Sequence, residues 1–399
     1  MSERILFKGA YIIDGTGAAA KKANLLIEGK KIIEIGNFTN ESAECIDLSG
    51  KVIMPGMINA HVHICFDGDS PDSFGAIAHE SSNTTAIRAV NNLKRLLQSG
   101  VTWFRDMGGR DYIDIDLRNA RKQGLVDGPQ FIAAGKLLTM TGGHGWSVGR
   151  ECDGVDEVRK AAREQLKAGA DFIKIMATGG ILTPGTEPGT PQLCFEEIQA
   201  AVEEANKAGK KTAAHAQGSA GVMNALRAGI DSIEHGIFLT DETIEEMLKR
   251  GTYLIPTLIA PCAIYYGGIE AGIPAFAVEK SGRVLQAHKE SFIKACKAGI
   301  NIAMGTDAGT PLNKMDMSAH EIELMVNAGM SNMDAVVSAT RNSARLLGID
   351  DEYGTLEKGK AADFIVLDSD PLADIKALQH SIIGVYKHGI LVNRNKSRW

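Results

Sequence analysis

Eight apolar runs, each followed by a segment of helical periodicity, repeat from about residue 56 to residue 327. Several of the helical segments end at a glycine just before the next apolar run, as at Gly100, Gly169 and Gly229, and glycine is the usual helix stop. Such an alternation predicts an α/β fold, and eight units in a row predict a (β/α)8 TIM barrel. The predicted strands are residues 57–64, 101–106, 130–135, 172–177, 212–216, 232–235, 253–257 and 302–305. The predicted helices are residues 84–98, 116–123, 155–168, 195–208, 219–228, 241–249, 278–297 and 318–327.

The two ends of the chain have a different pattern. Residues 1–55 read as short strands and turns with no helical period, and after a helix at 332–347 the β pattern returns at 362–367, 382–387 and 390–393. The simplest assembly joins residues 1–55 and 352–399 in one small β-sandwich-like domain, with residues 56–351 forming the barrel.

Composition narrows the classes of partner. The chain has 399 residues, a formal net charge of -6 and no block of Lys or Arg, which argues against nucleic acid or anionic membrane as a partner. No apolar run reaches the ~20 residues of a membrane span. The first residues lack a signal-peptide pattern and the six cysteines are scattered, so we expect a cytoplasmic protein with free thiols. Barrels of this kind often form homo-oligomers, but no interface can be read from the sequence.

Six potential metal ligands lie near the ends of five predicted strands. His61 and His63 are two residues apart, so a strand places them on the same face, where two imidazoles can chelate a divalent metal. The remaining ligands lie on the fourth, fifth and sixth strands and just after the eighth; they are Lys174, His215, His235 and Asp307. Because catalytic groups of such barrels lie at the carboxyl ends of the strands, all six could converge on one point. A single buried His is more often a hydrogen-bonded core residue, and Asp307 alone could cap a turn, so the set carries the prediction.

Lys174 is the most diagnostic of the six. A lysine inside an apolar strand is costly to bury as an ammonium, and an ammonium has no lone pair for a metal. Carboxylation by CO2 would turn the amine into a carbamate, an anionic oxygen donor that can bridge two metals. The alternative is a Lys174 ion-paired inside the barrel, for instance with Asp307.

The chain resembles the amidohydrolase superfamily, in the branch of imidazolonepropionase-related proteins and Xaa-Pro dipeptidase-like or carboxypeptidase-like enzymes. The resemblance covers nearly the whole chain. It is carried by residues 55–63 (PGMINAHVH), 174–180 (KIMATGG), 214–216 (AHA), 233–236 (IEHG), 305–309 (GTDAG) and 354–363 (GTLEKGKAAD).

The resemblance implies two divalent metal ions. His61, His63 and Asp307 would hold the first, His215 and His235 the second, and carboxylated Lys174 and a hydroxide would bridge them. Zinc is the first expectation, with Mn, Co and Fe left open. Related one-metal deaminases lack a lysine on the fourth strand, so Lys174 favours a two-metal hydrolase.

The resemblance, together with the chemistry of the expected substrate, suggests roles for further residues. Asp307 would act as general base and then general acid, and His144, after the third strand, would stabilise the oxyanion. Gln217 stands where many related peptidases have a tyrosine. Arg150, or else Arg110, could bind a substrate carboxylate, and Tyr265 could line a pocket, although ordinary surface roles would also explain these three.

The function that we expect is hydrolysis of small amides, as a dipeptidase or carboxypeptidase acting on Xaa-Pro-like dipeptides or N-acyl amino acids. An alternative is a cyclic amide, a lactone, or a xenobiotic ester, amide or phosphotriester. A non-catalytic scaffold would be expected to lack ligands, and none of the six is missing.

Overall fold

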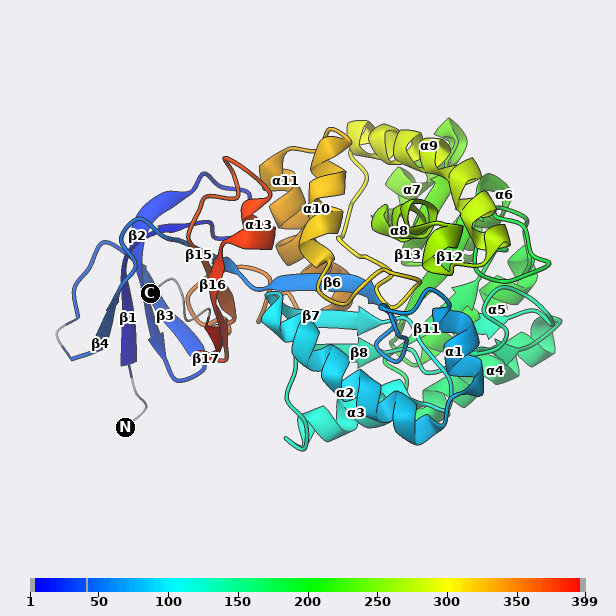
Figure 1. Ribbon diagram of the computed structural model, residues 1–399, viewed down its shortest axis with the longest axis horizontal. Coiled ribbons are helices and arrows are strands. Elements are labelled where there is room, and N and C mark those ends of the chain that lie inside the picture. The colour runs from blue at the N-terminus through cyan, green and yellow to red at the C-terminus, as the bar shows by residue number, and fades with distance from the viewer. Residues whose placement is uncertain (1–3, 41, 395–399) are drawn as a thin grey trace.

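The computed structural model describes residues 4–40 and 42–394. Strands from both ends of the chain form one eight-stranded sheet, drawn at the left of Figure 1. The order is β17-β16-β15-β5-β1-β2-β3, and β4 pairs with β1. The strands are β1 (Arg4–Ile12), β2 (Lys21–Glu28), β3 (Lys31–Gly36), β4 (Glu44–Asp47), β5 (Val52–Pro55), β15 (Phe364–Leu367), β16 (Ile382–Lys387) and β17 (Ile390–Arg394).

The two ends of the chain meet at β5. This strand pairs with β1 in parallel on one side and with β15 antiparallel on the other. A separate apolar core lies under the sheet, where the Phe364 ring stacks on Tyr386 at 4.5 Å and meets Phe7 edge-on at 5.1 Å. The sheet therefore depends on residues from both termini. The outermost residues assigned to this unit, 1–3 and 395–399, lie outside the described part of the chain.

The rest of the chain is built on parallel strands, which confirms the predicted α/β class. One sheet has the order β6-β7-β8 and the other β10-β9-β11-β12-β13-β14. These strands are β6 (Met57–Val62), β7 (Val101–Asp106), β8 (Gln130–Ala133), β9 (Leu138–Thr139), β10 (Arg150–Glu151), β11 (Phe172–Met176), β12 (Lys211–Gly218), β13 (Ser232–Phe238) and β14 (Tyr253–Ile255).

Single backbone contacts continue between the edges of these two sheets. The Asp171 N–H donates to Ala133 O at 2.8 Å, which links the start of β11 to β8. At the other edge, Leu254 of β14 forms a parallel bridge with Ile302, and Ala60 N of β6 donates to Met304 O at 2.8 Å. The segment around Ile302 to Met304 thus lies between β14 and β6.

Helices follow most of the parallel strands and pack outside them (Figure 1). Five of those in the described part of the chain, α4, α6, α7, α9 and α12, end at a glycine in the left-handed region, where a Cβ would cost energy. The helices are α1 (Ser73–His79), α2 (Ser82–Gln98), α3 (Ile113–Lys122), α4 (Val155–Ala168), α5 (Phe195–Lys207), α6 (Ser219–Ala228), α7 (Asp241–Arg250), α8 (Ile259–Gly267), α9 (Ala275–Ala298), α10 (Ser318–Asn327), α11 (Asn332–Val337), α12 (Ser343–Leu347) and α13 (Ala377–His380), with a 3-10 turn at Ile269–Ala271.

Two predicted elements differ from the structure. Residues 302–305 form only the bridge at Ile302 rather than a regular strand, because the segment turns toward Asp307, whose φ is 59°. The predicted helix 332–347 is interrupted by a π-helical stretch at Ser338–Asn342. The short helices α1, α8 and α13 were not predicted. Within the described residues, none of the helices combines the length and apolar character that a membrane span requires.

Candidate metal centre and active site

His61 and His63 lie at the carboxyl end of β6, and both turn Nε2 toward the same oxygen. The distance to Asp307 Oδ1 is 3.2 Å from His61 and 3.4 Å from His63. Possible ligand atoms of these three residues lie within 4.8 Å of one another. The strand spacing thus gives the predicted grouping of two imidazoles and a carboxylate.

Hydrogen bonds on the far side of each ring decide where its proton lies. His63 Nδ1 is 2.8 Å from Gly108 O, and a carbonyl only accepts, so Nδ1 carries the proton. His61 Nδ1 is 2.7 Å from the Glu234 carboxylate and donates to it. Both Nε2 atoms therefore hold lone pairs that face an anionic oxygen. A proton added to the Nε2 of one histidine would give only that histidine a hydrogen bond to Asp307. A divalent cation would bind both Nε2 atoms and the carboxylate, so these residues fit a metal ion.

His215 and His235 stand beside this group. Their ring centroids are 4.6 Å apart, and His235 is 5.2 Å from His61. Nε2 of His215 donates to Gly179 O at 3.2 Å, which leaves Nδ1 as its lone pair, and His235 Nδ1 lies 2.7 Å from Thr257 Oγ1. Burial lowers the pKa of both imidazoles well below the usual value, so both rings are neutral and suited to bind a metal.

His235, Thr257 and Asp307 have a strained backbone conformation that determines where their side chains point. Strand alternation would turn Glu234 and His235 to opposite faces of β13, yet both reach the site. The chain changes direction at His235, where φ is 73°, and the following Gly236 also has a positive φ. Positive φ values recur at Thr257 (50°) and Asp307 (59°), and strained residues of this kind gather at functional sites.

Lys174 is buried in β11 and lines the same cavity. Within the described residues, its Nζ has no hydrogen bond or ion pair, so the ion-paired alternative with Asp307 is not what the structure shows. Burial lowers the pKa of Lys174 to about 8, against the charges of Glu234 and Asp307, which raise it. A buried lysine without a counter-ion is suited to chemistry at the neutral amine.

Glu234 and Arg105 form an ion pair that the sequence analysis did not identify. Arg105 Nη2 donates to Glu234 Oε1 at 2.7 Å, and its other nitrogens donate to Ser232 Oγ at 3.1 Å and Ala60 O at 2.7 Å. Burial opposes ionisation, but the charge of Arg105 holds the pKa of Glu234 well below its usual range. The available signal was a charged residue inside each of two apolar strands, the same signal that identified Lys174.

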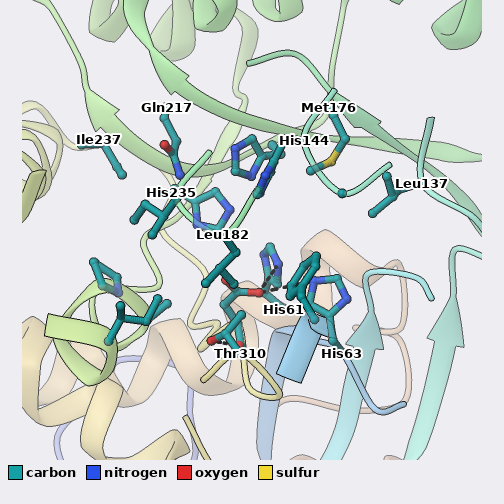
Figure 2. A pocket seen from close by; sticks show the side chains of 18 of the residues that line it. His61, His63, Leu137, His144, Met176, Leu182, Gln217, His235, Ile237 and Thr310 are labelled. Atoms are coloured by element: carbon teal, nitrogen blue, oxygen red, sulfur yellow. Dashed lines mark hydrogen bonds and ion pairs between the residues drawn. The ribbon is translucent and has the colours of Figure 1, made fainter. Parts of the chain in front are cut away.

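His144 lies in the loop after β9 and also lines the cavity. Figure 2 shows His144 and His235 above His61 and His63 in this view of the cavity. His144 Nδ1 is 2.9 Å from Thr183 Oγ1, and burial lowers the pKa of His144 to about 3, so the ring is neutral. Gln217 points into the same space, and its Oε1 is buried without a hydrogen-bond partner among the described residues.

Three predicted substrate residues are not brought to the cavity. Arg150 pairs with Glu164 at 2.9 Å, and Arg110 donates to Asp111 and to backbone carbonyls. Tyr265 is 43% exposed and packs edge-on against Tyr266. Beside the polar residues of the site, the cavity is lined by apolar side chains, among them Phe74, Leu137, Met176, Leu182, Ile237 and Ile264.

Comparison with known proteins agrees with this geometry. The model of the Amidohydrolase family matches residues 52–392, so the chain belongs to the Amidohydrolase family and is a hydrolase acting on C–N bonds. Members of this family generally bind metal ions, and the His61, His63 and Asp307 group is present here.

Three individual proteins illustrate the likeness. A Xaa-Pro dipeptidase crystallised with methionine in its active site is 33% identical, with a TM-score of 0.91 over 98% of this chain and 99% of the other. A prolidase in complex with N-methylphosphonate-L-proline is 31% identical, with a TM-score of 0.91 over 98% and 100%. Ochratoxinase from Aspergillus niger is 30% identical over 97% of this chain and 86% of its own length.

Proposed function

We propose that this protein is a two-metal hydrolase of small amides, acting on Xaa-Pro-like dipeptides or N-acyl amino acids. One observation carries the proposal: His61, His63, Lys174, His215, His235 and Asp307, drawn from distant parts of the chain, line a single cavity. The likeness to a Xaa-Pro dipeptidase and to a prolidase supports the peptide-like substrate.

In this proposal His61, His63 and Asp307 would hold one metal ion and His215 and His235 would hold the other. Lys174 would serve both, since addition of its free amine to CO2 with loss of a proton would yield an anionic carbamate oxygen donor. Zinc suits this donor set, although Mn, Co and Fe also suit it. Two bound cations would lower the pKa of a water, so that hydroxide forms near neutral pH, and would polarise the scissile carbonyl.

The chain's own residues then move protons and hold the substrate. Asp307 accepts the proton of the attacking water on a carboxylate oxygen and delivers it to the leaving nitrogen. His144, with Nδ1 engaged by Thr183, offers its Nε2–H to the carbonyl oxygen as negative charge develops. Gln217 Oε1, which is buried without a partner among the described residues, accepts a hydrogen bond from the substrate.

A second candidate is hydrolysis of a xenobiotic amide or ester. The likeness to ochratoxinase favours it, as does the cavity lining, which contains apolar walls and no arginine among the described residues. A carboxylate of a dipeptide would therefore be recognised by something other than Arg150 or Arg110 in this arrangement.

We also propose the architecture that carries the site: residues 56–351 close into a (β/α)8 barrel, and residues 1–55 and 352–399 form a small β-sandwich-like domain. The backbone contacts at Ala133 and Ile302 support closure, and the sheet shared by both termini supports the second unit. A cytoplasmic location and a homo-oligomeric state stay predictions.

A substrate screen tests the proposed function. Protein reconstituted with Zn, Mn or Co in the presence of bicarbonate is incubated with Xaa-Pro dipeptides, N-acyl amino acids, lactones and phosphotriesters. Release of free amino acid from either of the first two sets is the expected result. Turnover of lactones or phosphotriesters alone would contradict the proposal.

A further inference from the structure

We propose that Lys280 of α9 is a positioning residue for His144, acting through the loop of residues 179–192. Lys280 never reaches the cavity; it fixes the loop that holds the His144 ring and its proton. The inference deepens the proposed function, because it rests on His144 acting as the donor to the substrate carbonyl.

Lys280 has a complete set of partners, and two of them belong to this loop. The side chain is 5% exposed, and Nζ donates to Thr183 O at 3.0 Å and to Thr186 O. The third side of the ammonium faces the Phe276 ring, 5.4 Å from its centroid. An apolar residue would be cheaper to bury than an ammonium. The hydrogen bonds of Lys280 hold the carbonyl groups of Thr183 and Thr186 in fixed positions.

Thr183 links the loop to His144 through its side-chain hydroxyl. Thr183 Oγ1 accepts from Gly145 N–H at 3.0 Å and lies 2.9 Å from His144 Nδ1. The hydroxyl has a single proton, and among the described residues Nδ1 is the acceptor within reach. Donating to Nδ1 leaves the imidazole proton on Nε2, which is the tautomer that can donate to a substrate oxygen.

The loop also touches the ring directly. A Cβ placed on Gly180 would lie 2.4 Å from His144 Nε2 and 2.6 Å from both Cδ2 and Cε1, so the loop backbone packs against the face of the ring. Leu182, next to Thr183, forms part of the cavity wall. If the loop lost its contacts with Lys280, then Thr183, Gly180 and Leu182 would move together.

The experiment compares three single variants of the full-length, metal-loaded enzyme. Lys280→Met keeps most of the side-chain volume but donates nothing, and Thr183→Val removes the hydroxyl. Arg283→Met is the matched control, because Arg283 also reaches the loop from α9, through an exposed ion pair with Glu187 at 2.9 Å. Exposed pairs of this kind contribute little.

We expect Lys280→Met and Thr183→Val each to lower kcat roughly 10- to 100-fold, with metal content unchanged and a smaller change in KM. The double variant should lose no more than the worse single variant, because both act on one chain of contacts. Arg283→Met should stay within about twofold of wild type.

Two readouts do not depend on turnover. Nitrogen-15 NMR should show His144 protonated on Nε2 in wild type and a mixture of tautomers in Thr183→Val. Amide hydrogen exchange of residues 179–192 should be faster in Lys280→Met and unchanged in Arg283→Met. If no amide is ever turned over, these two measurements still decide the positioning role.

Two results would overturn the inference: unchanged loop exchange in Lys280→Met, or multiplicative losses in the double variant. Should Lys280→Met fail to fold, Thr183→Val still tests the tautomer, and a His144 spectrum identical to wild type in that variant counts against the inference.

Discussion

At the scale of single residues, the site is defined as much by the groups behind the imidazoles as by the imidazoles themselves. Glu234, the Gly108 carbonyl and Thr257 each contact the Nδ1 of one histidine, and so leave Nε2 for the cavity. Outer partners of this kind set both the tautomer and the basicity of a metal ligand.

Replacing Glu234 by glutamine should weaken metal binding about 10- to 100-fold. The amide cannot accept as strongly from His61, and it leaves Arg105 without its counter-ion. Metal per chain after dialysis against a graded chelator series measures the effect. Glu164→Gln, which removes a carboxylate from the Arg150 pair away from the cavity, is the control and should retain metal like wild type. Equal retention in both variants would rule out the role given to Glu234.

Lys174→Ala should remove bound metal and activity together, because it deletes the donor proposed to serve both ions. Metal content is measured by elemental analysis beside turnover, and wild type should reconstitute better with bicarbonate than without. Lys211→Ala, an exposed lysine on neighbouring β12, serves as control. A Lys174→Ala protein with two metals per chain and full turnover would show that the bridge assignment is wrong.

At this scale some site residues were predictable from the sequence and others were not. Residue types near predicted strand ends were enough to select the six residues that the structure gathers at one cavity, because the carboxyl ends of barrel strands share one end of the fold. The positive φ values that turn His235 and Asp307 toward the site were not visible in the sequence. Arg105 and Glu234 were missed although they sit in equally apolar strands, since they bind each other rather than a ligand. Arg150 and Tyr265 were selected from side-chain chemistry and loop position, and loop position does not specify the direction of a side chain.

At the scale of elements, two of the glycines in the loop of residues 179–192 allow the effect of side-chain packing to be tested apart from the effect of backbone strain. Gly180 faces His144, whereas Gly185 has open space around it but a φ of 77°. Gly180→Ala should lower kcat at least tenfold by displacing the ring, with little change in stability. Gly185→Ala should lower the unfolding free energy by about 1 kcal/mol and leave kcat unchanged. Urea unfolding and steady-state kinetics on both variants check the pair, and the reverse pattern would contradict it.

Glu321 of α10 joins two elements and should make stability depend on pH. Its oxygens accept from Leu258 N at 2.9 Å and Ile259 N at 2.7 Å, and burial raises its pKa to about 8. The folded state therefore keeps a proton that the unfolded state releases above about pH 4.5. The stability of wild type relative to Glu321→Gln should fall as pH rises from 5 to 8 and then level off. Urea unfolding at each pH measures the difference, and a constant difference would contradict the shift.

Elements were predictable where side chains repeat with one period and less so where backbone geometry decides. The helices α4, α6 and α10 begin and end where the sequence placed them, because apolar period and terminal residues agree. The eighth strand did not form as a regular strand, since residues 303–307 turn to bring Asp307 to the site. Short α1 and α8 gave too few residues to show a period.

At the scale of the whole molecule, the sheet shared by the two ends should behave as one unit. Phe364→Ala removes the ring that contacts both Phe7 and Tyr386, so it should destabilise this sheet by about 3 to 5 kcal/mol. Amide exchange in β1 should accelerate although β1 lies far from residue 364 in sequence, while bound metal is retained. Protection of β1 identical to wild type would argue against a single unit.

The pairing of β5 with β15 also has a consequence for synthesis of the chain. Strand β5 leaves the ribosome about 300 residues before β15, an interval of roughly 15 to 60 s at ordinary translation rates. Throughout that time one edge of β5 has no strand beside it, and open edges invite pairing with other chains. The N-terminal strands of the nascent protein therefore keep this open edge until residues 364–367 have been made, and we expect a binder of unpaired strand edges to have its longest opportunity during that interval.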